Sequence, residues 1–218
     1  MRGLNNNKLL LHLKKTKNMK KLLSLILILS FTIKAQDVTI GTQNWMSKNL
    51  DVTTYRNGDK IPQVQDANAW VNLKTGAWCY YENKGGNGTT YGKLYNWYAV
   101  NDPRGLAPKG YHIPKDAEWT ILTENLGFEA GTEMKSTSGW KNNGNGNNTS
   151  GFAGLPGGCR YYDGGFSNIG ANGYWWSSSE DAQETHLAWS RYLFSNSDDV
   201  VRNYGNKRDG FPVRCLRD

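Results

Sequence analysis

Two histidines and one serine run are the first candidates for acid–base or nucleophilic chemistry. Beyond residue 35 the chain holds only His112 and His186, and no HExxH or HxH spacing joins them into a zinc motif. His112 lies just before a predicted helix, where a hydrogen-bonded structural role is the favoured interpretation. The run Ser177–Glu180 lacks the GxSxG turn that exposes a catalytic serine, so we interpret it as the end of a strand.

Acidic residues are the next candidates, for a glycosidase pair or a calcium site. Asp198 and Asp199 are adjacent, and adjacent side chains on a strand point to opposite faces, which is typical of a solvated turn. A glycosidase needs two carboxylates that project into one cleft, and the spacing of the glutamates does not indicate such a pair. We therefore predict no catalytic residue, no metal and no cofactor. We predict that Glu118 caps a helix. The other glutamates are of helix-surface type, namely Glu124, Glu129 and Glu133.

Three cysteines, Cys79, Cys159 and Cys215, offer thiol chemistry. Their spacings contain neither CxxC nor a Cys/His zinc pattern. In an oxidising compartment cysteines tend to pair, and with three of them one thiol is left over. The residues alone leave open any of the three pairings, or three reduced cysteines packed as small hydrophobic side chains.

The net charge of +7 is concentrated at the N-terminus. Residues 1–35 contain eight of the 26 cations and no acid, so the remainder of the chain has 18 cations against 19 acids. A nearly neutral chain lacks the excess of lysine and arginine that neutralises phosphates. Nucleic acid is therefore disfavoured as a partner.

Residues 1–35 are predicted to be a signal peptide. Lys20 and Lys21 follow Met19, the run Leu22–Ile33 is apolar or small, and Ala35 offers a cleavage point before Gln36. The run of 12 residues is shorter than the ~20 that span a bilayer. Met19 is an alternative start, and an uncleaved anchor is the alternative to cleavage. We predict an extracellular or cell-surface protein with no membrane span in residues 36–218.

The stretch 110–128 predicts a helix that packs through a tryptophan. Pro114 suits the entry, acids follow in the first turn, and Trp119 begins an apolar stripe that continues at Leu122 and Leu126. Lys115 stands where a Ser or Thr cap is expected, so either Asp116 caps the helix or the first turn frays. Gly127 is expected to end the helix, with Phe128 folded back on the last turn.

A first amphipathic helix is predicted over residues 90–100. Tyr91, Leu94, Tyr95 and Tyr98 fall at i, i+3, i+4 and i+7, with Thr89 or Thr90 as cap and a stop near Asn101–Pro103.

The remaining pattern is rich in strands and loops. Together with two short helices it predicts an α+β fold in one domain, residues 36–218, whose N-terminal strand pairs with the C-terminal one. Loops are expected at Gly139–Ser150, Asp163–Gly173 and Ser195–Asn206. The predicted strands are Val38–Ile40, Asn44–Met46, Cys159–Tyr162, Tyr174–Ser178, Leu187–Phe194, Val200–Tyr204 and Phe211–Leu216.

Several blocks stand in a recognisable order from Val38 to the C-terminus. The longest is Gly110–Leu122, GYHIPKDAEWTIL. The others are Gln43–Met46, Asn49–Leu50, Tyr91–Trp97, Ser150–Phe152, Leu155–Gly158, Tyr174–Ser178 and Val213–Cys215. Through these blocks the chain resembles the Fibrobacter succinogenes major paralogous domain (FISUMP) family.

The resemblance implies a C-type-lectin-like fold, in which long loops over a rigid base present ligands. The Pro-x-x-Ala-Glu-Trp block is also similar to the formylglycine-generating, sulfatase-modifying family, but this chain lacks the cysteine-containing motifs that such chemistry needs. The calcium motifs Glu-Pro-Asn and Trp-Asn-Asp of sugar-binding lectins do not occur. Cys79 and Cys215 stand where the chain resembles the family and Cys159 does not, which favours a Cys79–Cys215 disulfide.

Aromatic residues beside the predicted loops are the candidate ligand contacts. They can stack on a sugar ring or a partner protein, and packing in the core is the alternative for each. We predict a secreted or cell-surface, non-catalytic binding module for a glycan or a protein. A structural or adhesive surface protein is the second hypothesis, and an extracellular enzyme acting on polysaccharide is the third. The candidate contacts are Trp140, Tyr161, Tyr162 and Phe166.

Overall fold

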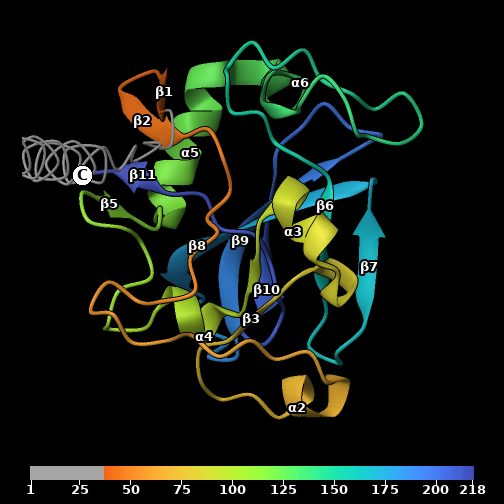
Figure 1. Cartoon of the computed structure of the whole chain (residues 1–218). Coiled ribbons are helices and arrows are strands. Elements are labelled where there is room, and N and C mark those ends of the chain that lie inside the picture. Colours follow the sequence, from red (N-terminus) through yellow and green to blue (C-terminus); the bar gives the residue numbers. More distant parts are fainter. Residues whose placement is uncertain (1–36) are drawn as a thin grey trace, which may run out of the picture. The chain divides into compact units, whose positions relative to one another are not determined.

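The computed structural model describes residues 37–218, which the contacts place in one compact unit (Figure 1). The predicted signal peptide lies outside the described residues. Within them, no helix combines the length and the hydrophobicity that a bilayer crossing requires. The helices are α2 (Ala67–Val71), α3 (Gly85–Tyr91), α4 (Trp97–Val100), α5 (Asp116–Leu126) and α6 (Ala130–Met134), with 3-10 turns η1 (Tyr81–Asn83) and η2 (Gly127–Glu129).

The strands form two larger antiparallel sheets and two strand pairs, which confirms the α+β class. One sheet has the order β1-β2-β11-β5, from β1 (Asp37–Ile40), β2 (Gln43–Met46), β11 (Leu216–Arg217) and β5 (Tyr111–His112). The other has the order β10-β9-β8, from β10 (Val201–Asn206), β9 (Leu187–Phe194) and β8 (Asn172–Glu180). The pairs are β3 (Trp78–Cys79) with β4 (Leu94–Tyr95), and β6 (Gly157–Arg160) with β7 (Phe166–Ile169).

The two ends of the described chain meet in the first sheet, as predicted. Leu216 lies opposite Trp45 in the register of β11 and β2. The Met46 N–H donates to the Cys215 carbonyl at 3.0 Å, which extends the pairing beyond the strands. The N-terminal hairpin is therefore held by the last residues of the chain.

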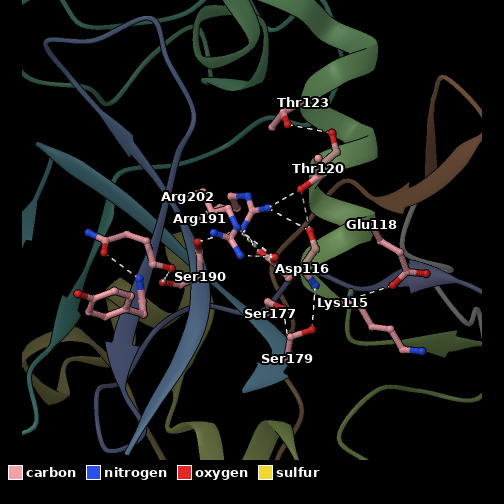
Figure 2. Close-up of polar contacts among 12 residues, drawn as sticks. Lys115, Asp116, Glu118, Thr120, Thr123, Ser177, Ser179, Ser190, Arg191 and Arg202 are labelled. Atoms are coloured by element: carbon pink, nitrogen blue, oxygen red, sulfur yellow. Dashed lines mark hydrogen bonds and ion pairs between the residues drawn. The ribbon is translucent and has the colours of Figure 1, made fainter. Parts of the chain in front are cut away.

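The helix α5 forms where the sequence predicts it, with Lys115 as its N-cap residue. The Glu118 carboxylate accepts the Lys115 N–H at 2.7 Å, so Glu118 caps the helix as expected. Asp116 does not cap it, because its carboxylate accepts from Arg191 and Arg202 instead (Figure 2). The Asp116 N–H donates to the Ser179 hydroxyl from β8 at 3.1 Å. Trp119 on the buried face is fully enclosed.

The end of α5 departs from the prediction at one residue. Gly127 takes a positive φ of 76° and its N–H donates to the Thr123 carbonyl, as a helix-ending glycine does. Phe128 does not fold back on the last turn, and its side chain is 91% exposed. The chain continues directly into η2 and α6, which carries Phe128 outward.

The single helix predicted over residues 90–100 is wrong. Gly92 has a φ of 78° and its N–H closes α3 on the Gly88 carbonyl, so neither Thr89 nor Thr90 begins a helix. The next residues form β4, which pairs with β3. Helix α4 then starts after Asn96, whose side chain accepts the Ala99 N–H at 3.1 Å, and it ends at Asn101 as predicted.

The predicted loops and strands of the C-terminal half are partly confirmed. The strand Leu187–Phe194 is β9, and residues 139–150 contain no helix or strand. The predicted strand Val200–Tyr204 is β10, so only the first part of the predicted loop 195–206 is loop. The predicted loop 163–173 includes β7 and the start of β8. The predicted strand 211–216 reduces to β11, because Pro212 has no N–H and Phe211 pairs instead with Tyr95 as an isolated bridge.

Aromatic rings supply much of the core, because aliphatic side chains are few. Trp45, Trp119, Phe152 and Trp175 pack where the first sheet, α5 and one face of the β8–β10 sheet meet, with Trp45 and Trp119 only 4.7 Å apart between ring centroids. A second cluster surrounds Trp176 on the other face of the β8–β10 sheet. Both clusters contain rings in edge-to-face contact.

The cysteines of residues 37–218 are not bonded to one another, so the structure does not contain the expected Cys79–Cys215 disulfide. Cys79 packs in a cluster with Trp70, whereas Cys159 and Cys215 lie in the cluster around Trp176. Burial raises the pKa of each thiol to about 12. The three side chains therefore pack as small hydrophobic groups.

Candidate functional site

A cleft of about 700 Å³, here called the tyrosine cleft, lies where the β6–β7 hairpin meets the β8–β10 sheet. The hairpin packs along β8, on the side of the fold away from the β1–β2 hairpin (Figure 1). The lining of the cleft combines aromatic rings with amides, one carboxyl group and one imidazole. The main lining residues are Tyr161, Tyr162, Asn168, Asn172, Tyr174, His186, Tyr192, Phe194, Asn203, Tyr204, Asn206, Asp209 and Phe211.

The floor of the cleft is a set of packed rings. Tyr174 and Phe211 stack with centroids 5.0 Å apart, and Tyr192 meets Tyr174 edge-on at 4.7 Å. The Tyr192 hydroxyl donates to the Tyr204 carbonyl at 3.0 Å, which ties the floor to β10. These contacts give the cleft a rigid apolar base.

Two asparagines converge on the floor from neighbouring strands. The Nδ2 groups of Asn168 and Asn172 both donate to the Tyr174 hydroxyl, at 2.8 and 2.7 Å. Within residues 37–218, no hydrogen bond reaches their Oδ1 atoms. Both amides line the cleft, and their Oδ1 atoms are available as acceptors.

Exposed tyrosines form the rim. The side chains of Tyr161 and Tyr162 are 37% and 49% exposed, and both residues come from the turn between β6 and β7. Tyr204 is also exposed, but it lies opposite Trp189 in the register of β10 and β9 and packs against that ring, so its side chain lies on the α5 face of the sheet. The rim thus offers two exposed aromatic rings on the hairpin side of the opening.

Asp209 joins the two sides of the cleft from behind. Its carboxylate accepts the Tyr162 N–H at 2.7 Å and the Asn206 N–H at 2.9 Å. The side chain is buried, and burial raises the pKa of Asp209 to about 7 despite these hydrogen bonds. Asp209 supplies the one carboxyl group among the described lining residues.

The opposite face of the same sheet is held by α5 through a polar cluster (Figure 2). Successive residues of a strand point to opposite faces, so Arg191 faces α5 while Tyr192 faces the cleft. Arg191 Nη1 lies 2.6 Å from Asp116 Oδ1, and Arg202 Nη2 lies 2.8 Å from Asp116 Oδ2. Burial alone would raise the pKa of Asp116, but the hydrogen bonds from both arginines outweigh it and lower the pKa.

The structure brings two of the four candidate contacts to the cleft. Tyr161 and Tyr162 line it. Trp140 is only 5% exposed, and its Nε1 donates to the Ser136 hydroxyl and the Gly154 carbonyl, which places the ring in the core. Phe166 is partly buried and packs against the Tyr81 ring at 5.4 Å.

Sequence reasoning missed the amides and Asp209. The alternation of β9 carries the signal for Tyr192 and Phe194, since i and i+2 share a face of a strand. Asn168 and Asn172 belong to a segment read as a loop, and only the β6–β7 pairing brings Asn168 to the sheet. Asp209 follows a turn, and nothing local to it indicates burial.

His186 is the sequence candidate that lines the tyrosine cleft, where its exposed ring has Glu184 Oε2 at 3.5 Å from Nδ1. The remaining candidates lie outside the cleft. His112 has Asp218 Oδ1 at 2.8 Å from Nδ1 and Glu118 Oε1 at 3.0 Å from Nε2. The serine run ends β8 as predicted, and the Ser178 hydroxyl donates to the Ile113 carbonyl. Among residues 37–218 no three metal-binding side chains come together.

The arrangement of the tyrosine cleft suits non-covalent recognition. Its groups are stacking faces, amides, phenol hydroxyls and the His186 imidazole, and its carboxyl group is already bonded to backbone. Small-molecule sites commonly combine an apolar lining with a few placed polar groups in this way.

Comparison with known proteins gives one match. The family model described as Fibrobacter succinogenes major domain matches residues 38–217. No curated protein and no solved structure matches the chain, so the C-type-lectin-like relation stays a prediction.

Proposed function

This chain belongs to the Fibrobacter succinogenes major domain family, and we propose that its folded part is an exported, non-catalytic binding module whose tyrosine cleft takes a glycan. The observation that supports the proposal is the pairing of exposed tyrosine rings with fixed amide acceptors around one opening. Export rests on the signal-peptide pattern of residues 1–35.

The two kinds of group in the cleft match the two faces of a sugar. A pyranose presents C–H groups that pack on an aromatic ring, and hydroxyl groups that donate to amide oxygens. Tyr162 on the rim supplies an open ring, while Asn168 and Asn172 supply acceptors held by the Tyr174 hydroxyl. An uncharged sugar fits better than an acidic one, because Asp209 places a carboxyl group behind the cleft.

The carboxyl chemistry of the cleft supports binding without catalysis. Hydrolysis of a glycoside uses a pair of carboxyl groups on either side of the bond. The described lining has Asp209 alone, and both of its oxygens accept backbone N–H groups.

A protein-binding or adhesive role is the second candidate, and one observation favours it. Phe128 is 91% exposed and Ile121 is 42% exposed, both on the α5–η2 segment and outside the lining of the cleft. Exposed aromatic side chains often contact partner proteins. In that role the module would act through this surface and need no small ligand.

A glycan array probed with the purified full chain tests the proposal, once with calcium and once with chelator. We expect binding that is unchanged by chelator and that falls by about 10-fold in Tyr162→Ala, the loss expected for one aromatic contact of about 1.4 kcal/mol. Phe128→Ala is the matched control, because it removes an exposed ring outside the cleft and should bind as the wild type does.

Three outcomes would contradict the glycan proposal in different ways. A blank array under both conditions would favour the adhesive role. Loss of binding in Phe128→Ala, with Tyr162→Ala unaffected, would move the site to α5 and η2. Release of reducing sugar from bound polysaccharide would show an enzyme.

A further inference from the structure

A second cavity, here called the Arg214 cavity, has a volume of about 540 Å³. It lies between the loop that follows β2 and the C-terminal end of α3, away from the residues of the tyrosine cleft. Its polar and charged lining residues are Ser47, Lys48, Asn49, Asp51, Thr89, Thr90 and Arg214.

Arg214 is the unusual member of this lining, because its side chain is 1% exposed and its acceptors are all neutral. Nη1 donates to the Met46 and Phe152 carbonyls at 2.9 and 2.6 Å. Nε and Nη2 both donate to the Asn49 Oδ1 atom, at 3.2 and 3.0 Å. Of the five guanidinium N–H groups, one on Nη2 has no acceptor among residues 37–218.

A buried cation without an anionic partner is uncommon, since buried charges are normally paired. Arg191, for example, is buried but forms an ion pair with Asp116. Arg214 has no carboxylate within ion-pair distance in residues 37–218, and burial lowers the pKa of its guanidinium to about 9. Arg160 is also buried on carbonyl acceptors, but it does not line this cavity.

Asn49 occupies the position where a carboxylate partner would be expected. Its Oδ1 atom accepts from Trp175 Nε1 at 2.9 Å as well as from the guanidinium of Arg214. Its Nδ2 group donates to the Tyr91 carbonyl at 2.9 Å, which fixes the orientation of the amide. The side chain therefore orients Arg214 without neutralising it.

The remaining charges around the cavity favour an anion. Lys48 is exposed in the lining, whereas the Asp51 carboxylate is paired with the buried ammonium of Lys93. The positive charges of Lys48 and Arg214 are thus the unmatched ones. Thr89 and Thr90 add hydroxyl groups from α3.

We infer that the Arg214 cavity binds a small oxyanion, with a carboxylate, phosphate or sulfate group held between Arg214 and Lys48. Planar guanidinium groups bind such oxyanions through directed N–H bonds. The inference does not depend on the tyrosine cleft, and the two sites can be tested separately.

Thermal unfolding of the purified full chain tests the inference, with acetate, phosphate and sulfate titrated in turn against chloride at constant ionic strength. We expect a saturable rise in Tm with at least one oxyanion, of about 3–5 °C at tenfold excess over Kd. The oxyanion that gives the larger rise at lower concentration identifies the preferred group.

Two variants and one control make the result specific. Asn49→Asp supplies an internal carboxylate to Arg214 and should abolish the rise. Lys48→Ala removes an exposed charge without touching the core and should weaken the apparent affinity by about 3–10-fold. Lys109→Ala removes an exposed lysine outside the cavity and should leave the titration unchanged.

The inference is overturned if no oxyanion gives a saturable rise, or if Lys48→Ala and Lys109→Ala titrate as the wild type does. If Asn49→Asp does not fold, the comparison of Lys48→Ala with Lys109→Ala still decides whether the oxyanion binds in the Arg214 cavity. An equal rise in the folded Asn49→Asp variant would also place the anion elsewhere.

Discussion

Asp209 is a single residue on which both sides of the tyrosine cleft depend. Its two backbone hydrogen bonds hold Tyr162 on the hairpin and Asn206 at the end of β10. A carboxylate accepts both bonds better than a neutral acid does, yet burial disfavours the charge and raises the pKa to about 7. The cleft is therefore held by a group that titrates near neutral pH.

This raised pKa predicts how stability changes with pH. Between the unfolded pKa, about 3.9, and the folded value of about 7, the folded chain keeps a proton that the unfolded chain releases. The contribution of Asp209 to stability is thus largest at low pH and falls as pH rises through this interval, by about 1.4 kcal/mol per unit. Urea unfolding at a series of pH values, compared between wild type and Asp209→Asn, measures the slope. Parallel curves for the two proteins would contradict the assignment.

At the residue scale, the sequence predicts which residue types matter better than it predicts which way they point. Trp45 and Trp119 are buried as their patterns indicate. Tyr161 and Trp140 satisfy the same criterion of an aromatic residue beside a loop, but only Tyr161 reaches a cleft. The Trp140 ring turns inward because Ser136 and Gly154 accept its N–H there. The sequence alone does not identify these partners.

At the scale of elements, α5 is attached to the β8–β10 sheet by charge as well as by packing. Trp119 fills the apolar part of the contact, and Asp116 binds Arg191 and Arg202 at its edge (Figure 2). Arg191 is 2% exposed, so Asp116 is its compensating charge. The charged contact at this face of the sheet comes from α5, while Trp45 and Phe152 add to the apolar packing there.

Removal of that carboxylate is expected to be costly. Asp116→Ala leaves Arg191 buried without an anion, and breaking a buried pair from one side costs roughly 3–5 kcal/mol. Denaturant unfolding measures the loss. Glu124→Ala, an exposed residue of the same helix, is the control and should change stability by about 0.5 kcal/mol or less. Equal stabilities of the two variants would mean that packing alone holds α5.

The contrast between α5 and residues 90–100 shows what local periodicity can predict. In α5 the apolar spacing coincides with acids in the first turn and a closing glycine, so several local signals agree. Over residues 90–100 the same spacing arises without a continuous helix. A Cβ atom at Gly92 would lie 3.1 Å from the Leu50 carbonyl. The glycine that ends α3 is therefore required by a contact with a residue distant in sequence.

At the scale of the whole molecule, the three cysteines are buried and not bonded to one another, and we predict that they play no covalent part in stability. Adding dithiothreitol should leave Tm unchanged to within about 1 °C, because no cross-link constrains the unfolded chain. Thiol titration should find no reactive group in the folded protein and three after unfolding. A fall in Tm of several degrees on reduction would show that a disulfide is present.

The class of the fold and the meeting of the chain ends could be predicted, but the grouping of strands could not. Leu187–Phe194 has a clear apolar pattern and is a strand. Nothing in that pattern says that its neighbours are β8 and β10, or that the β6–β7 hairpin closes one side of a cleft beside them. The pairing of strands depends on contacts between residues distant in sequence. The alternation of apolar and polar residues indicates only which side chains share a face of one strand.

The pairing of β2 with β11 also governs when the domain can form. Trp45 lies near the start of the matched family domain, and its partner Leu216 lies near its end. Closing a sheet across nearly the entire domain is slow, since the loop entropy must be overcome before the contact is gained. This sheet therefore cannot close during synthesis until nearly the whole domain has been made.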